Sequence, residues 1–212
     1  MSKLYFRYGT MGSSKTANAL MTKFNYEEKG YNVLLIKPSI DNRDGKTIIK
    51  SRIGLESEAI VINPQENLMY DITVKYGYHI GKYRNTLENP IDCIIVDEAQ
   101  FLSKENIEDL KQIADTYETP VFCYGLRTDF QSNLFEGSKR LFEISDSISE
   151  IKSICHCGNK AIINAKYNDN QIIYDGEQID IGGNDKYIGL CYRCWVEGKL
   201  NRHINKINVD TI

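Results

Sequence analysis

Gly9-Thr10-Met11-Gly12-Ser13-Ser14-Lys15-Thr16 directly follows the apolar run Leu4-Tyr5-Phe6-Arg7-Tyr8. A strand leading into a Gly-rich loop that ends in Lys-Thr is typical of a phosphate-binding loop, because the free N–H groups of the following helix face an anion. In the usual pattern, G-x-x-x-x-G-K-[ST], the lysine reaches the β- and γ-phosphates and the hydroxyl binds Mg²⁺. The segment therefore predicts nucleotide binding.

One position of the loop departs from this pattern. Ser14 stands where the pattern has its second glycine. Glycine lets the backbone approach a phosphate without a Cβ atom, so we expect Ser14 to weaken nucleotide affinity. Taken alone, the segment also fits an ordinary Gly/Ser turn, and the context must distinguish the two interpretations.

Short apolar runs alternate with segments of helical periodicity along the first part of the chain. The runs are continuous, as in strands buried on both faces of a parallel sheet, and lie at 4–8, 33–36, 94–96 and 121–124. Helices are expected over 15–29, over 104–116 after a Ser103 cap, and over 64–78. This alternation predicts an α/β fold, a doubly wound parallel sheet with its ligand crevice at the carboxyl ends of the strands.

The apolar run 94–96 ends in the acidic pair Asp97-Glu98. A strand-end aspartate of this kind binds Mg²⁺ in proteins with a phosphate-binding loop, although a solvated strand end is the alternative. Glu98 could orient a water molecule in an ATPase or accept the proton of a substrate hydroxyl in a kinase. The pair alone does not separate these two reactions.

The sequence pattern changes after about residue 150, where the cysteines lie in two close pairs. We expect domains at 1–150 and 151–212. Four thiolates suit a tetrahedral zinc ion, and a closed four-thiolate site is structural because it leaves no position for water. Buried thiols or redox-active dithiols are the alternatives. The predicted zinc ligands are Cys155, Cys157, Cys191 and Cys194, whereas Cys93 and Cys123 are expected in the core.

Composition narrows the functional classes. The 212-residue chain has a net charge of −3, which argues against a dedicated nucleic-acid binder. Its apolar runs are too short for a signal peptide or a membrane span. We expect a cytoplasmic protein without disulfides, because thiols stay reduced there.

Together these motifs resemble those of the type II thymidine kinases, especially the bacterial and phage branch. The resemblance covers nearly the whole chain and includes the phrases at 96–101 and 124–130, the C-x-C-G spacing, and Ile181-Gly182-Gly183 before Asp185-Lys186-Tyr187. It implies ATP-dependent phosphorylation of the thymidine 5′-hydroxyl by a homotetramer. It also implies a small zinc domain that carries a substrate-gripping loop, called the lasso.

The resemblance further implies individual roles. Glu98 would be the catalytic base, and Thr16 and Asp97 would bind Mg²⁺. ATP would contact Gly9, Thr10, Met11, Gly12, Ser13, Ser14, Lys15, Thr16, Arg43, Asp97, Glu98, Ala99 and Gln100. Thymidine would contact Met11, Phe101, Leu126, Phe130, Phe135, Ile179, Ile181 and Tyr187.

Two other functions stay open on the sequence. A zinc-ribbon ATPase acting on nucleic acid would hydrolyse ATP in response to DNA and ignore nucleosides, but the chain lacks a basic, aromatic-rich stripe. A catalytically inactive nucleotide-binding module would follow only if Ser14 abolished ATP binding. We expect thymidine and ATP as partners, and neither nucleic acid nor membrane.

Overall fold

The computed structural model describes residues 3–43, 45–80, 90–179 and 186–200. Its centre is a six-stranded sheet in the order β10-β1-β9-β8-β2-β5, and every neighbouring pair is parallel. The strands are β1 (Leu4–Tyr8), β2 (Val33–Pro38), β5 (Ile60–Ile62), β8 (Cys93–Val96), β9 (Val121–Gly125) and β10 (Ser147–Glu150). All four predicted apolar runs form strands of this sheet, which confirms the parallel α/β fold.

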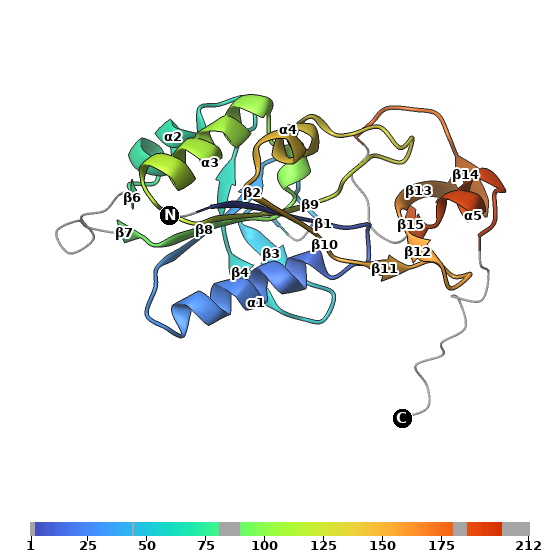
Figure 1. Cartoon of the computed structure of the whole chain (residues 1–212), viewed down its shortest axis with the longest axis horizontal. Helices are drawn as coiled ribbons and strands as arrows, with labels where there is room; N and C mark the ends of the chain where they lie inside the picture. Colours follow the sequence, from blue (N-terminus) through green and yellow to red (C-terminus); the bar gives the residue numbers. More distant parts are fainter. Residues whose placement is uncertain (1–2, 44, 81–89, 180–185, 201–212) are drawn as a thin grey trace.

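Helices cover both faces of the sheet (Figure 1). On one face lies α1 (Lys15–Glu27), which buries Ala19 and Leu20 in a cluster that includes Phe122. On the other lie α3 (Lys104–Thr116) and α4 (Glu136–Ile144). The predicted cap of α3 is confirmed, since Ser103 Oγ accepts a hydrogen bond from the backbone N–H of Asn106 at 3.2 Å. The sheet is therefore doubly wound.

The segment between β2 and β8 is more irregular than predicted. In place of one helix over 64–78, the chain forms a short α2 (Leu68–Tyr70), capped by Asn67, and a π-type turn η1 (Asp71–Lys75). The pairs β3 (Ile48–Lys50) with β4 (Glu56–Glu58) and β6 (His79–Ile80) with β7 (Pro90–Ile91) complete this region. None of the helices in the described ranges is long and apolar enough to cross a bilayer.

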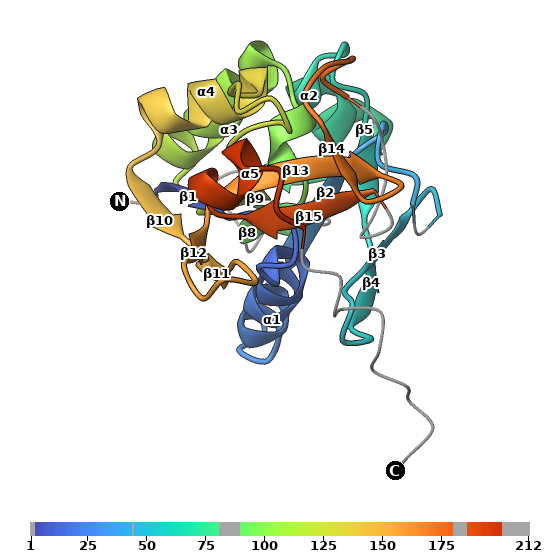
Figure 2. The same ribbon diagram turned by 90° about the vertical axis from the view of Figure 1, so that its right-hand side faces the viewer.

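The C-terminal part is built from short antiparallel strands. They are β11 (Ser153–Ile154), β12 (Lys160–Ala161), β13 (Ile163–Asn168), β14 (Gln171–Ile173) and β15 (Tyr187–Leu190), followed by α5 (Tyr192–Val196). Figure 2 shows β13, β14, β15 and α5 stacked in front of one end of the parallel sheet. Three of the paired cysteines lie in the small core of this part, and Trp195 packs against it.

The parallel register brings the predicted motifs to one edge. Tyr8, the last residue of β1, pairs with Gly125 at the end of β9, and Val96 of β8 pairs with Cys123. The loop at 9–16, the acidic pair and the segment after β9 therefore leave the sheet side by side. A short helical turn, η3 (Ala99–Phe101), follows the acidic pair.

Candidate active site

A cavity of about 390 Å³ opens at this edge of the sheet, a size suited to a small-molecule ligand. It brings together most of the predicted site residues from segments far apart in the sequence. The predicted residues that line it are Met11, Gly12, Ser14, Lys15, Thr16, Arg43, Asp97, Glu98, Gln100, Phe101, Leu126, Phe130, Phe135, Ile179 and Tyr187.

Four predicted residues lie behind the cavity wall. Gly9 donates its N–H to the Gly125 carbonyl at 3.2 Å, and a Cβ atom on it would come within 2.5 Å of the Ile151 carbonyl oxygen. Thr10 Oγ1 hydrogen-bonds Ser153 Oγ in the C-terminal part. Ser13 and Ala99 are buried. None of these four residues lines the cavity, and Gly9 and Thr10 anchor the loop to neighbouring segments. Ile181 lies outside the described residues.

The backbone of the loop explains why glycine is usual at position 14. Ser14 precedes α1 and has φ 62° and ψ 28°, the left-handed conformation that costs a residue with a Cβ about 1–2 kcal/mol. The chain adopts the loop conformation in spite of the serine, at a cost in stability. Strained residues of this kind are typical of functional sites.

The lysine of the loop is buried at the start of α1. Lys15 Nζ donates to the Thr10 carbonyl at 2.8 Å. Burial lowers its pKa, and the nearby Glu98 and Asp97 oppose this effect. The ammonium group therefore stands in a low-dielectric pocket where it interacts strongly with an anion.

Asp97 is fully buried and incompletely hydrogen-bonded. Thr16 hydrogen-bonds its carboxylate, but Oδ1 has no hydrogen-bond partner among the described residues. Burial, reinforced by the charge of Glu98, raises the pKa of Asp97 to about 7. A buried carboxylate oxygen without a donor, next to a hydroxyl, fits a divalent cation with oxygen ligands.

Glu98 is held from both sides of its carboxylate. Oε1 accepts a hydrogen bond from Arg43 Nη2, and Oε2 accepts one from Gln100 Nε2 at 2.6 Å. Burial alone would raise the pKa of Glu98, but Arg43 and Lys15 outweigh it and lower the pKa. The backbone φ of 52° is again left-handed. The result is an ionised, fixed carboxylate on the cavity wall.

Aromatic and aliphatic side chains form another part of the wall. The rings of Phe101 and Phe135 meet edge to face, with centroids 5.7 Å apart. Phe130 is almost fully buried, and Leu126 directly follows β9. Such a surface accommodates a flat, partly apolar ring.

Asn164 is a cavity residue that the sequence analysis missed. Its Oδ1 accepts from the Met11 N–H at 2.8 Å and its Nδ2 donates to the Thr128 carbonyl at 2.8 Å. It therefore ties β13 to the loop at 9–16 and to the segment after β9. The only signal in the sequence is a polar residue within the apolar run 161–165, which no motif marks.

Six more charged or polar residues line the cavity without having been predicted, namely Asp41, Lys50, Ser51, Arg52, Asp129 and Gln178. Gln178 Nε2 donates to Asp129 Oδ2 at 2.8 Å, which links the C-terminal part to the segment after β9. Arg52 enters from the β3–β4 hairpin. Asp129 belongs to the motif phrase at 124–130, whereas Gln178 and Arg52 carry no motif signal.

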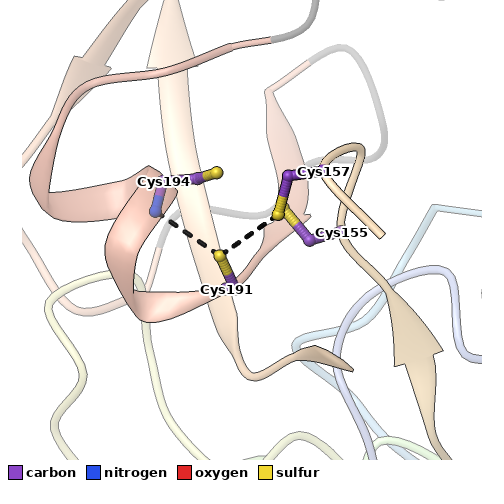
Figure 3. A group of neighbouring side chains, drawn as sticks. All are labelled: Cys155, Cys157, Cys191 and Cys194. Carbon is purple, nitrogen blue, oxygen red and sulfur yellow. Dashed lines mark hydrogen bonds between the residues drawn. The ribbon is translucent and has the colours of Figure 1, made fainter. Parts of the chain in front are cut away.

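The four predicted cysteine ligands converge (Figure 3). All four are free thiols, and their sulfur atoms lie within 4.8 Å of one another. A tetrahedral metal with bonds of about 2.3 Å to sulfur places its sulfurs about 3.8 Å apart, so the cluster could bind zinc. The Asn159 N–H lowers the pKa of Cys157 to about 6, which favours the thiolate. His156 lies between the first two cysteines in the sequence, and its Nε2 hydrogen-bonds the Lys199 carbonyl oxygen at 3.0 Å.

Comparison with known proteins agrees with these features. The family model for thymidine kinase matches residues 2–195. A thymidine kinase of Zymomonas mobilis is 46% identical over 202 residues, which cover 95% of this chain and 99% of the relative. A thymidine kinase of Rhodopirellula baltica is 44% identical, covering 90% and 86%, and one of Shewanella oneidensis is 43% identical, covering 90% and 95%.

Proposed function

The chain belongs to the thymidine kinase family and acts as a thymidine kinase, and we propose that it transfers the γ-phosphoryl group of ATP to the thymidine 5′-hydroxyl. One observation carries the proposal. A single cavity is lined by residues of the loop at 9–16, by the carboxylate of Glu98, and by the aromatic side chains Phe101, Phe130 and Phe135. This arrangement supports the proposal that ATP and thymidine bind next to Glu98 in one cavity.

The loop at 9–16 and the N-terminus of α1 would bind the ATP phosphates. Their backbone N–H groups and helix dipole favour an anion, and Lys15 adds a full positive charge. Thr16 and Asp97 would hold Mg²⁺, which neutralises charge on the phosphates during transfer. The unpartnered Oδ1 of Asp97 supports this assignment.

Glu98 would accept the proton of the attacking 5′-hydroxyl. A low pKa makes it a weak base, but the loose transition state of phosphoryl transfer depends more on positioning than on deprotonation. Gln100 and Arg43 fix its carboxylate before substrate arrives. Arg43 could also stabilise charge that develops on the phosphoryl group.

The aromatic part of the cavity would enclose the nucleoside. Met11, Phe101, Leu126, Phe130 and Phe135 supply apolar surface, and Ile179 and Tyr187 flank the segment that we assign to the lasso. A base enclosed in this way is selected by its hydrogen bonds, because a mismatched base would leave buried polar groups unpaired. Enclosure also excludes water and so limits ATP hydrolysis.

Four broader properties accompany this function. We propose that the cysteine cluster binds structural zinc and that the domain boundary falls at residue 150, where the last strand of the parallel sheet ends. We also propose a homotetramer, which light scattering on the purified protein would test. A cytoplasmic location suits an ATP-dependent enzyme with free thiols.

Transfer from γ-labelled ATP with Mg²⁺ tests the function. Thymidine, deoxycytidine, purine deoxynucleosides, single-stranded DNA and water are compared as acceptors. We expect labelled thymidine monophosphate as the dominant product. Labelled free phosphate that rises with DNA and ignores thymidine would instead identify a nucleic-acid ATPase. Lack of ATP binding at millimolar concentration, with the fold intact, would identify an inactive nucleotide-binding module.

A further inference from the structure

Lys37 is a buried lysine to which the mechanism above gives no role. It is the fifth residue of β2 and only 1% exposed, and it does not belong to the cavity lining. A buried ammonium group is costly unless it is paired and hydrogen-bonded, so its partners indicate what it holds in place.

The partners of Lys37 all belong to the segment that follows β2. Its Nζ donates to the Ile48 carbonyl at 2.9 Å and to the Gly45 carbonyl at 3.2 Å. It also lies 3.8 Å from Oδ2 of Asp41, which is 6% exposed. The ammonium group thus fixes this segment at three points against the end of the sheet.

Asp41 connects Lys37 to the cavity residues Arg43 and Glu98. Its Oδ1 accepts a hydrogen bond from Arg43 Nε at 2.7 Å, while Nη2 of the same guanidinium binds Glu98. Because Nε and Nη2 are fixed relative to each other in the planar guanidinium, holding one atom orients the other. The chain of contacts runs from Lys37 through Asp41 and Arg43 to the carboxylate of Glu98.

We propose that Lys37 is a positioning residue for phosphoryl transfer, acting through Asp41 to hold Arg43 against Glu98. The inference rests on the proposed roles of Arg43 and Glu98. Lys37 touches no substrate, so its loss changes the geometry of groups that act in the transition state. The rate of transfer then falls while nucleoside binding changes little, since misplacement of about 1 Å can cost about 100-fold in rate.

A double-mutant cycle tests this role. Lys37→Met, Arg43→Gln and the double variant are compared with the parent enzyme in steady-state transfer to thymidine, at a temperature where circular dichroism shows each folded. We expect Lys37→Met to lower kcat about tenfold to 100-fold with the KM for thymidine within about twofold. In the Arg43→Gln background, the same change should lower kcat less than about twofold, because the two residues act on one contact.

Further variants separate positioning from simple destabilisation. Lys37→Arg keeps the charge and should recover part of the lost kcat. Lys75→Met is the matched control and should leave kcat unchanged. Like Lys37, Lys75 lies near a buried aspartate four residues away in the sequence, with its Nζ 3.4 Å from Asp71 Oδ1. If Lys37→Met does not fold, Lys37→Gln takes its place, because its amide still donates to a carbonyl oxygen.

The outcomes distinguish this inference from the proposed function. A parent enzyme that does not phosphorylate thymidine would overturn the function itself. With an active parent, an equal loss of kcat in the presence and absence of Arg43 would refute the positioning role and leave Lys37 a structural residue. An unchanged kcat in Lys37→Met would also refute it.

Discussion

Gly125 and Gln100 are in such close contact that a Cβ atom on Gly125 would lie 2.8 Å from Gln100 Oε1 and 3.1 Å from its backbone nitrogen. Gln100 Oε1 accepts from the Leu126 N–H at 2.9 Å, and its Nε2 donates to Glu98. The absence of a side chain at 125 is therefore a condition for the orientation of Glu98.

From this contact we predict that Gly125→Ala lowers kcat about tenfold to 100-fold, because displacement of Gln100 releases one side of the Glu98 carboxylate. ATP affinity should change little, since the loop at 9–16 is not displaced. Steady-state kinetics and calorimetric titration with an ATP analogue would measure both. Parental kcat in a folded Gly125→Ala variant would contradict the prediction.

Replacement of the proposed base gives a second prediction. Glu98→Gln keeps the shape of the side chain but removes its ability to accept a proton, so turnover should fall by about 100-fold or more. ATP binding should be retained. Glu143→Gln, on the exposed side of α4, is the matched control and should keep parental turnover. Unchanged turnover in Glu98→Gln would exclude the base assignment.

The strain at Ser14 gives a third prediction. Ser14→Gly removes the Cβ from a left-handed backbone, which should raise the free energy of unfolding by about 0.5–1 kcal/mol after the greater chain entropy of glycine is counted. ATP affinity should stay equal or increase. Urea unfolding would measure the stability, with Ser14→Ala as the control that keeps the Cβ. A large loss of ATP affinity in Ser14→Gly would show that the serine hydroxyl contacts the nucleotide.

Burial of Asp97 predicts a dependence of stability on pH. Its pKa is about 7 in the folded protein and near 3.8 in the unfolded chain, so between these values the folded state keeps a proton that the unfolded state loses. Its contribution to stability is complete below about pH 4 and is lost as the pH rises through 7. Asp97→Asn should therefore be more stable than the parent at pH 7 without Mg²⁺, on the order of 1–3 kcal/mol, and not at pH 4. If the free energy of unfolding of the two proteins depended on pH in the same way, the prediction would be refuted.

The cysteines give a fifth prediction. Burial raises the pKa of Cys93 to about 12, and Cys123 is buried in the same sheet, so neither should react with iodoacetamide at pH 8 in the folded protein. Removal of the metal with a chelator should expose only the four clustered thiols to alkylation, as read by mass spectrometry. One zinc per chain retained by a Cys155→Ser variant would remove Cys155 from the ligand set.

The parts of the fold that could be predicted are those encoded by local patterns. Continuous apolar runs marked β1, β2, β8 and β9 because a strand buried on both faces has no polar positions. The edge strands β5 and β10 were missed. The short apolar run of β5 lies in the irregular segment between β2 and β8, and alternating serines in β10 give no continuous run. The helix expected over 64–78 was too long because its periodicity does not reveal the π-type turn at Asp71.

The candidate site also has a part that local patterns predict and a part that they do not. Residues 9–16, Asp97, Glu98 and the cysteines belong to motifs whose spacing reflects their chemistry, and the structure brings each set together. Asn164 and Gln178 act through contacts between segments distant in the sequence. Lys37 contacts the irregular segment that directly follows β2, which no motif marks. A single side chain that bonds a distant backbone amide leaves no periodic signal, so only the three-dimensional structure reveals it.

The contacts of Asn164 also affect the order in which the site forms while the chain is being synthesised. The side-chain amide that binds Met11 comes from β13. Gly189 of β15 also lies against Met11, since a Cβ atom on Gly189 would be 3.4 Å from the Met11 carbonyl oxygen. A nascent chain that has emerged from the ribosome only as far as β10 has every strand of the parallel sheet but lacks these contacts to the loop at 9–16. The loop at 9–16 thus gains its contacts from β13 and β15 only after every strand of the parallel sheet has been synthesised, which delays its complete assembly until translation of β15 is finished.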